Sequence, residues 1–352
     1  MLSVFISGAS SEEAQHRGLF VSMLQEPPVL SGPAPVTQLL DFARNAHIGI
    51  LFVQIYHANK AWFPSRLADS EWYEDNRKRL SEDPFAQLIE QAHRRGIQVH
   101  AWINLLSLGE NRDAMIVKKY GRDILTTNLK KKRELEDYRI DGQYFLEPGD
   151  PRVRQELAGI IREIVNAYPQ LDGLQFDYIR YPDIDPHYGY SAMNMRRFKQ
   201  ASGLHTILDQ SPAWKKWKRD QVTQLLTLLA NEARQLRPNI QISTTGCLPY
   251  VRAYEEAFQD WPSWLSRGLV DFVTVMDYSP RPLEFSGWIE DVKKRVRDFK
   301  RVKIGVGAYR FAASPAGFLQ EFRRCEQQKA DCVIFHYGSL QDHPALRGVL
   351  TD

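Results

Sequence analysis

The sequence predicts an α/β fold, namely a single (β/α)8 TIM barrel, and three observations support this prediction. Short apolar stretches rich in Val, Ile and Phe alternate with longer stretches of helical periodicity along the chain. Eight strand candidates can be recognised, which is the number that closes a barrel of this type. An open doubly wound sheet, the alternative, should show a glycine-rich phosphate turn after an early strand, and the sequence has none.

The expected strands have a high β-branched and aromatic content, and several are apolar on both faces, as strands covered on both sides should be. In chain order they are residues 18–24, 48–56, 97–104, 173–179, 240–246, 270–276, 302–309 and 331–337. In a barrel, the carboxyl ends of such strands meet at one rim and build the active site.

The helices expected between these strands have clear start signals. An N-cap Asp or Ser precedes a first-turn proline at Asp83-Pro84, Asp150-Pro151, Ser211-Pro212 and Ser314-Pro315. After Asp150, apolar residues recur at helical spacing from Val153 to Val165, which predicts one buried stripe. Residues 288–299 repeat this pattern without a cap proline.

We interpret residues 1–352 as one domain, because α/β barrels often reach this length. Residues 105–146 break the alternation and form a long loop insertion after the third strand. The charged run 130–137 within it predicts a solvated face. Alternatively, the segment could wall one side of a substrate cleft.

Composition narrows the classes of function. Hydrophobic residues make up 43% and charged residues 25%, and a net charge of +3 is too mild to suggest a nucleic-acid partner. The three cysteines, Cys247, Cys325 and Cys332, predict buried free thiols and no disulfide framework. Neither a signal peptide nor a membrane span is recognised, so we expect a cytoplasmic protein, or an extracytoplasmic one if a leader was removed.

Two aspartates end apolar strands and are the predicted catalytic pair. Asp177 lies in "LDGLQFDYIRYP", where nearby Arg180 would favour the charged carboxylate that a nucleophile or general base requires. As an alternative, these two residues form a structural ion pair. Asp277 ends "VTVMD" in more apolar surroundings, which would raise its pKa and suit a general acid. It could equally order Tyr278 or bind a sugar hydroxyl.

Aromatic, amide and charged side chains at the same rim are typical of a carbohydrate site, since aromatic faces stack on sugar rings and polar groups bind hydroxyls. The residues expected to bind or orient sugar are Tyr56, His57, Trp102, Asn104, Glu147, Arg180, Tyr181, Tyr278 and His336. Glu26 and Glu147 are reserve acids, each interpreted as structural or substrate-binding. The histidines lack metal-ligand spacing, so no metal and no other cofactor is predicted.

At "LDGLQFDYIRYP" the sequence resembles the glycoside-hydrolase-like family 10 proteins, which are bacterial barrel proteins related to amylase-type and chitinase-type hydrolases. The likeness runs from about residue 17 to 340 and includes "ILFVQIYHANKAWFPS", "VHAWIN", "LEPGDPRVRQEL" and "DWPSWLSRGLVDFVTVMDY". It implies a (β/α)8 fold and action on a glycan, often a polysaccharide of the cell envelope. It maps the family's strand-end Asp onto Asp177, with Arg180 and Tyr181 as its companions.

The chitinase-type catalytic pattern, Asp-Gly-x-Asp-x-Asp-x-Glu, is not met. Gln175 replaces its middle Asp, and Ile179 stands where its Glu should be. We therefore expect a two-carboxylate glycoside hydrolase acting on an oligo- or polysaccharide. Two alternatives stay open: a non-catalytic glycan-binding barrel and a metal-dependent carbohydrate deacetylase.

Overall fold

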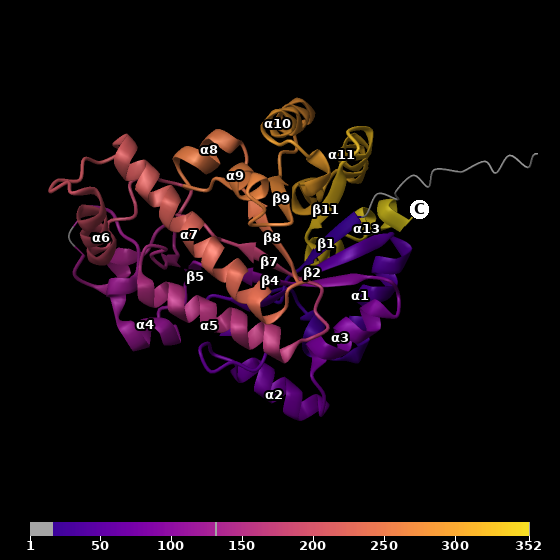
Figure 1. The fold of residues 1–352 in the computed structure, drawn as a ribbon. Helices are drawn as coiled ribbons and strands as arrows, with labels where there is room; N and C mark the ends of the chain where they lie inside the picture. The colour runs from indigo at the N-terminus through magenta and orange to yellow at the C-terminus, as the bar shows by residue number, and fades with distance from the viewer. Residues whose placement is uncertain (1–16, 131, 352) are drawn as a thin grey trace, which may run out of the picture.

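The computed structural model describes residues 17–130 and 132–351, and it contains a closed barrel of eight parallel strands (Figure 1). The strands are β1 (Arg17–Val21), β2 (Ile48–His57), β4 (Gln98–Asn104), β7 (Gly173–Asp177), β8 (Gln241–Gly246), β9 (Phe272–Asp277), β10 (Val302–Gly307) and β11 (Asp331–Phe335). They follow one another round the barrel, and pairing of β1 with both β2 and β11 closes it. The predicted (β/α)8 fold is therefore confirmed.

Strand residues alternate between the barrel interior and the surrounding helix layer. The interior holds a small aromatic cluster that includes Phe20, Phe52, Trp102 and Phe272. The residues between them along the strands, such as Val273 on β9, belong to the large core under the helices. This alternation decides which strand-end residues can reach the barrel mouth.

Helices surround the barrel. They are α1 (Pro33–Asn45), α2 (Glu71–Leu80), α3 (Pro84–His93), α4 (Met115–Tyr120), α5 (Pro151–Ala167), α6 (Ala192–Ser202), α7 (Pro212–Leu236), α8 (Tyr250–Glu255), α9 (Trp261–Ser266), α10 (Pro282–Arg295), α11 (Pro315–Gln327), α12 (Tyr337–Asp342) and α13 (Pro344–Thr351). Figure 1 shows the two longest, α5 and α7, packed side by side.

The four predicted helix starts are found. Each N-cap side chain accepts a backbone N–H bond in the first turn, and each proline occupies the first helical position, at Asp83, Asp150, Ser211 and Ser314. The helix expected at 288–299 begins earlier, at Pro282, and ends at Arg295. Its start was missed because Arg281 supplies no side-chain cap.

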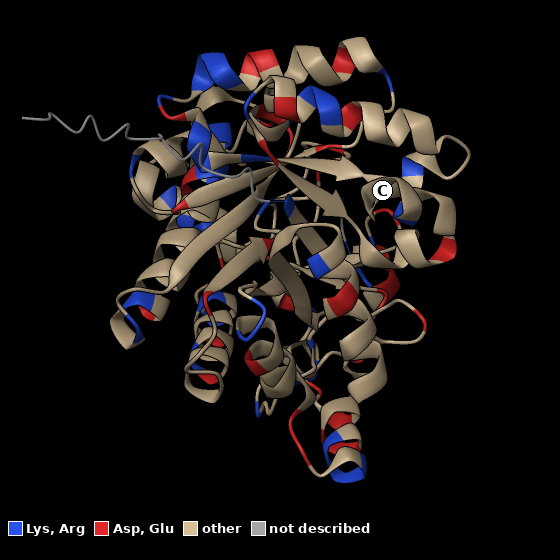
Figure 2. Cartoon of the chain, turned by 90° about the vertical axis from the view of Figure 1, so that its right-hand side faces the viewer, with Lys and Arg blue, Asp and Glu red and all other residues tan. Residues whose placement is uncertain are grey.

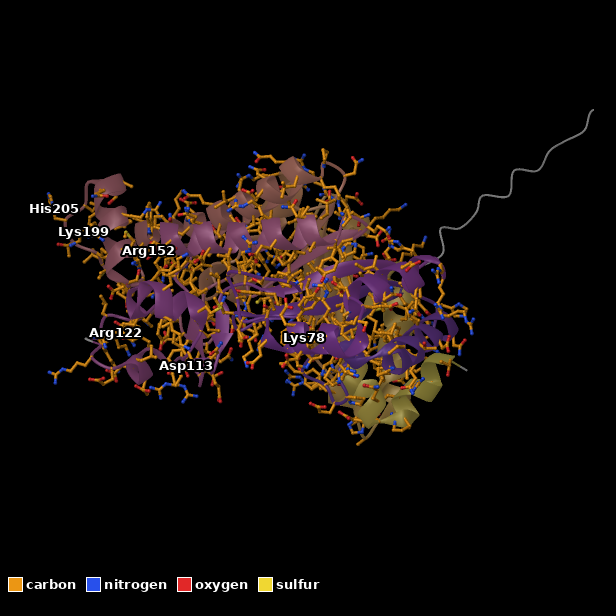
Figure 3. All side chains as sticks on the ribbon, turned by 90° about the horizontal axis from the view of Figure 1, so that it is seen from below. Lys78, Asp113, Arg122, Arg152, Lys199 and His205 are labelled. Atoms are coloured by element: carbon orange, nitrogen blue, oxygen red, sulfur yellow. A yellow bond between two sulfur atoms is a disulfide. The ribbon has the colours of Figure 1, made fainter. Side chains whose placement is uncertain are left out.

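Residues 105–146 contain the short strands β5 (Ser107–Gly109) and β6 (Tyr144–Phe145), which pair antiparallel, and α4 between them. The described residues of the charged run 130–137 are exposed or half-buried. Figure 3 places Arg122, Arg152, Lys199 and His205 together, at the end of the molecule away from the C-terminal helices. The segment and α6 thus extend the barrel on one side.

Cys325 of α11 and Cys332 of β11 form a disulfide, which corrects the expectation that these thiols are free. Their separation of seven residues spans the end of α11 and the start of β11, and so brings the two together. Cys247 is free and buried, as expected.

Figure 2 shows basic and acidic residues interspersed over the outer helices. Among the helices that the structure describes, none has the length and apolar character needed to cross a membrane. The N-terminal segment 1–16, on which the prediction about a signal peptide depends, lies outside the described residues.

Candidate active site

A cavity of about 720 Å³ opens where the carboxyl ends of the strands meet, the usual place for a site in this fold. Its walls come from β1, β2, β4, β7, β8, β9 and β11 and from the loops that follow them. The predicted site residues that line it are His57, Trp102, Asn104, Asp177, Arg180, Tyr278 and His336.

Asp177 is the hydrogen-bonding centre of this cavity. The indole N–H of Trp102 donates to its Oδ2 at 2.9 Å, and the Asn104 amide donates to the same oxygen at 3.4 Å. The hydroxyl of Thr245 donates to Oδ1 at 2.6 Å, as does the backbone N–H of Tyr178 at 2.7 Å. An ionised carboxylate only accepts hydrogen bonds, and all four of these contacts are donated to it.

A further layer of hydrogen bonds fixes the amide of Asn104. Gln54 donates through Nε2 to Asn104 Oδ1 at 2.9 Å, so the Asn104 Nδ2 group is turned toward Asp177. Ser22 donates in turn to Gln54 Oε1 at 2.9 Å. This chain joins β1, β2, β4 and β7, which are successive strands of the barrel. Ser22 was not predicted, although it follows the rule that polar side chains at strand ends face the mouth.

Arg180 lies in the cavity wall but does not pair with Asp177. Its Nη1 forms an ion pair with Asp183 at 2.8 Å, and Arg252 of α8 binds the other oxygen of Asp183 at 2.6 Å. The Arg180 guanidinium also lies 4.7 Å from the centre of the Tyr178 ring, while its Nε is buried without a partner. Tyr178, directly after Asp177, has a φ of 51°, so the backbone is left-handed at this residue. The side chains of Tyr178 and Arg180 both line the cavity. The alternative of an Asp177–Arg180 ion pair is thus not what the structure shows.

Asp277 is not brought to Asp177, which corrects the predicted pair. Its neighbours Met276 and Tyr278 line the cavity, whereas the fully buried Asp277 carboxyl faces the helix layer. Burial raises the pKa of Asp277 to about 8. Neither carboxyl oxygen has a hydrogen-bond partner among the described residues, and the charges of Glu321 on α11 and Glu284 on α10 add to the rise. The pKa of Asp277 is raised, as expected, but its carboxyl group lies on the side of the strand that faces away from the cavity.

Three predicted sugar-binding residues also lie away from the cavity. Tyr181 donates to Glu147 at 2.5 Å in a buried network, and burial raises the pKa of Glu147. Tyr56 accepts a hydrogen bond from Asn59 at 3.2 Å, and burial raises its pKa to about 12. Tyr181 and Glu147 lie beyond the strand ends, whereas Tyr56 is still in β2, where a register shift between Gln54 and Tyr56 places Tyr56 in the large core under the helices.

The remaining predicted residues bring imidazole and aromatic groups to the mouth. His57 and His336 each have a buried Nδ1 without a hydrogen-bond partner, and burial lowers the pKa of both rings. Tyr278 stacks on Phe335, with ring centres 5.1 Å apart and an interplanar angle of 27°. Phe335, at the last strand end, was not predicted.

Two further carboxylates line the cavity, Glu26 in the loop after β1 and Asp342 at the end of α12. Both side chains are exposed. Glu26 was expected only as a reserve acid, and Asp342 was missed because it lies seven residues beyond β11. Residues 105–146 contribute no side chain to this cavity, so the described part of that segment does not wall it.

Residues 17–130 and 132–351 contain no group of three or more His, Cys, Asp or Glu side chains placed to hold a metal ion. The cavity histidines come from β2 and from the residue after β11. The structure therefore gives no ligand set through which a metal-dependent step could be derived.

The sequence model of the family described as glycosyl hydrolase-like 10 matches residues 33–310. Glycosyl hydrolase DigH of Escherichia coli K12 is 24% identical over 328 residues, covering 82% of this chain and 72% of that protein. Glycosyl hydrolase YngK of Bacillus subtilis is 24% identical over 265 residues, covering 68% of this chain and 48% of that protein.

Solved structures with the same architecture include the glycoside hydrolase domain of PgaB (BpsB) from Bordetella bronchiseptica. It superposes with a TM-score of 0.72 at 17% identity over 96% of this chain and 99% of that domain. The catalytic domain of a Paenibacillus polymyxa β-amylase superposes with a TM-score of 0.60 at 11% identity, over 92% and 93% of the two chains. At these identities the likeness concerns the fold.

Proposed function

The chain belongs to the glycosyl hydrolase-like 10 family, and from this premise we propose that it is a glycoside hydrolase that cleaves an oligo- or polysaccharide. The glycan would come from the bacterial envelope or an exopolysaccharide, bound in the cavity at the barrel mouth. One observation carries the proposal: the Asp177 carboxylate is held by four hydrogen bonds in a cavity that is also lined by aromatic rings.

In this proposal Asp177 acts as the nucleophile or the general base. The four donors hold one orientation of its carboxylate, so little reorganisation is needed when charge develops on the sugar. Tyr278 with Phe335 offers an aromatic surface to a sugar ring, and Asn104, His57, His336 and Arg180 offer groups that bind its hydroxyls.

Glycoside cleavage requires a second carboxyl group, and Asp277 is not placed to provide it. We propose that this acid is one of the two other carboxylates in the cavity, Glu26 or Asp342. Glu26 follows β1, which is three strands from β7 round the barrel, and Asp342 follows β11, which is four strands away. A sugar held between Asp177 and either residue would have carboxyl groups on opposite sides of its glycosidic bond, as both known mechanisms require.

The test compares turnover of soluble bacterial cell-wall glycan strands and exopolysaccharides by the parent protein and by single variants. Asp177→Asn should abolish product formation, and either Glu26→Gln or Asp342→Asn should reduce it strongly. Asp277→Asn is the matched control, because it makes the same chemical change outside the cavity. Unchanged turnover in Asp177→Asn would refute the assignment of that residue.

A second candidate, a glycan-binding barrel without turnover, is favoured by one observation. Glu26 and Asp342 are both exposed, whereas a general acid usually needs a buried setting that raises its pKa. A parent protein that binds these glycans without releasing product would establish this second function.

A further inference from the structure

One aromatic side chain stands out beside the cavity. Tyr309 lies in the short 3-10 helix Ala308–Phe311 that follows β10, and 41% of it is exposed. Among the residues that the structure describes, it is the most exposed of the Phe, Trp and Tyr side chains. A single exposed aromatic ring is normal on a protein surface, so a binding role for Tyr309 must be argued from the residues around it.

The ring of Tyr309 continues the aromatic wall of the cavity outward. Its centre lies 6.0 Å from that of Tyr278 and 6.3 Å from that of Phe335, and both of these residues line the cavity. Three consecutive strands, β9, β10 and β11, thus present one connected aromatic surface that begins inside the cavity and ends in solvent.

The backbone is shaped to allow this contact. A Cβ at Gly307 would lie 3.0 Å from Cε1 of Tyr309 and 3.2 Å from Cβ of Tyr278. Both distances are tighter than ordinary contacts, so any larger residue at position 307 would push the two rings apart. Glycine at the end of β10 therefore keeps Tyr309 against the cavity wall.

Arg310 supplies a polar group at the same place. Its guanidinium carbon lies 5.1 Å from the centre of the Tyr309 ring, and the residue is exposed to solvent. An aromatic face next to an exposed guanidinium suits a sugar, which presents C–H groups on its ring face and hydroxyl oxygens at its edge.

We infer that Tyr309 and Arg310 form an additional sugar-binding subsite outside the cavity, which takes the next sugar ring of a chain whose reacting sugar lies beside Asp177. This inference rests on the proposed function and sharpens it: the substrate extends across β9, β10 and β11, and longer chains are preferred over the shortest ones.

Binding measurements test this subsite independently of turnover. Cell-wall glycan strands and N-acetylglucosamine oligomers, graded in length from disaccharides upward, are titrated calorimetrically into Asp177→Asn protein, so that hydrolysis does not intervene. Adding Tyr309→Ala should weaken binding of the long oligomers about three- to ten-fold, as expected for the loss of one aromatic packing contact. Disaccharide binding should not change.

Two further variants serve as controls. In the same Asp177→Asn protein, Tyr309→Phe keeps the ring and should leave binding unchanged. Leu283→Ala trims a side chain of α10 that is 91% exposed and should also have no effect. Equal weakening at every length, no weakening at any length, or no binding of any oligomer would each overturn the subsite. Binding that depends on length and on Tyr309, in a parent without turnover, would instead refute only the hydrolase proposal.

Discussion

The two sides of the barrel mouth are built differently. On the side of β1, β2, β4, β7 and β8, polar side chains form one connected network that ends on Asp177. On the side of β9, β10 and β11, aromatic rings form the wall, and the aspartate that ends β9 is turned away from it. In the proposed hydrolase, the polar side would hold the charged carboxylate and the aromatic side would bind a sugar ring.

The largest expected effect concerns the polar side. Asp177→Asn keeps the shape of the side chain but removes its charge, and it sets the new amide N–H groups against the donors that Asp177 now accepts from. We expect turnover of the preferred glycan to fall by roughly 10³-fold or more, the range in which loss of a central catalytic group acts. Product release measured by chromatography checks this. A fall below ~10-fold would remove Asp177 from the centre of the mechanism.

The corresponding substitution at the end of β9, Asp277→Asn, should change the stability of the protein and leave turnover unchanged. The folded protein holds a proton on Asp277 up to a pKa of about 8, whereas the unfolded chain loses it near the ordinary value of 3.8. The folded state therefore binds more protons between these two values, and the free energy of unfolding falls as pH rises across this window. At about 1.4 kcal/mol per pH unit, we expect Asp277→Asn to remove that decline and to stabilise the protein by roughly 6 kcal/mol at a pH above 8.

Urea unfolding of the parent and of Asp277→Asn at acid, neutral and alkaline pH measures this effect. The gap between the two proteins should be small near the lower end of the window and widest above its upper end. A constant gap at all pH values would show that Asp277 is already ionised in the folded protein. Turnover by Asp277→Asn close to that of the parent would separate the two aspartates by function.

Asp177 and Asp277 also show which parts of the fold and the site can be predicted from the sequence. Strand positions, the barrel and the capped helices follow from apolar runs and start signals, so the eight strands and the four capped helix starts were predicted. Both aspartates end apolar runs, but a run that is buried on both faces does not reveal which residues face inward. The residue two positions earlier on each strand shares the face of the aspartate and gives a signal of its direction. Gln175 is polar and lies on the interior face with Asp177, whereas Val275 is apolar and lies on the helix side with Asp277.

Other site residues depended on contacts that a single sequence does not contain. Ser22 and Gln54 reach Asp177 only through Asn104, along strands far apart in the chain. Tyr181 seemed to belong with Asp177, four residues before it, but its backbone N–H binds Ala257 and its hydroxyl binds buried Glu147. Loop direction beyond a strand end is set by such tertiary partners.

The smallest of these effects tests one hydrogen bond in the network. Trp102→Phe removes the indole N–H that lies 2.9 Å from Asp177 but keeps an aromatic ring in the interior cluster. A hydrogen bond to a charged group contributes about 1.5–3 kcal/mol, so kcat/KM should fall about 10- to 100-fold. The control is Trp264→Phe, which removes an indole bond to Thr223 in the helix layer, at 2.8 Å, and should cost stability with little loss of kcat/KM. If both variants lose stability alone, the Trp102 bond supports only the packing of the barrel, and the network on this side would not be part of the catalytic apparatus.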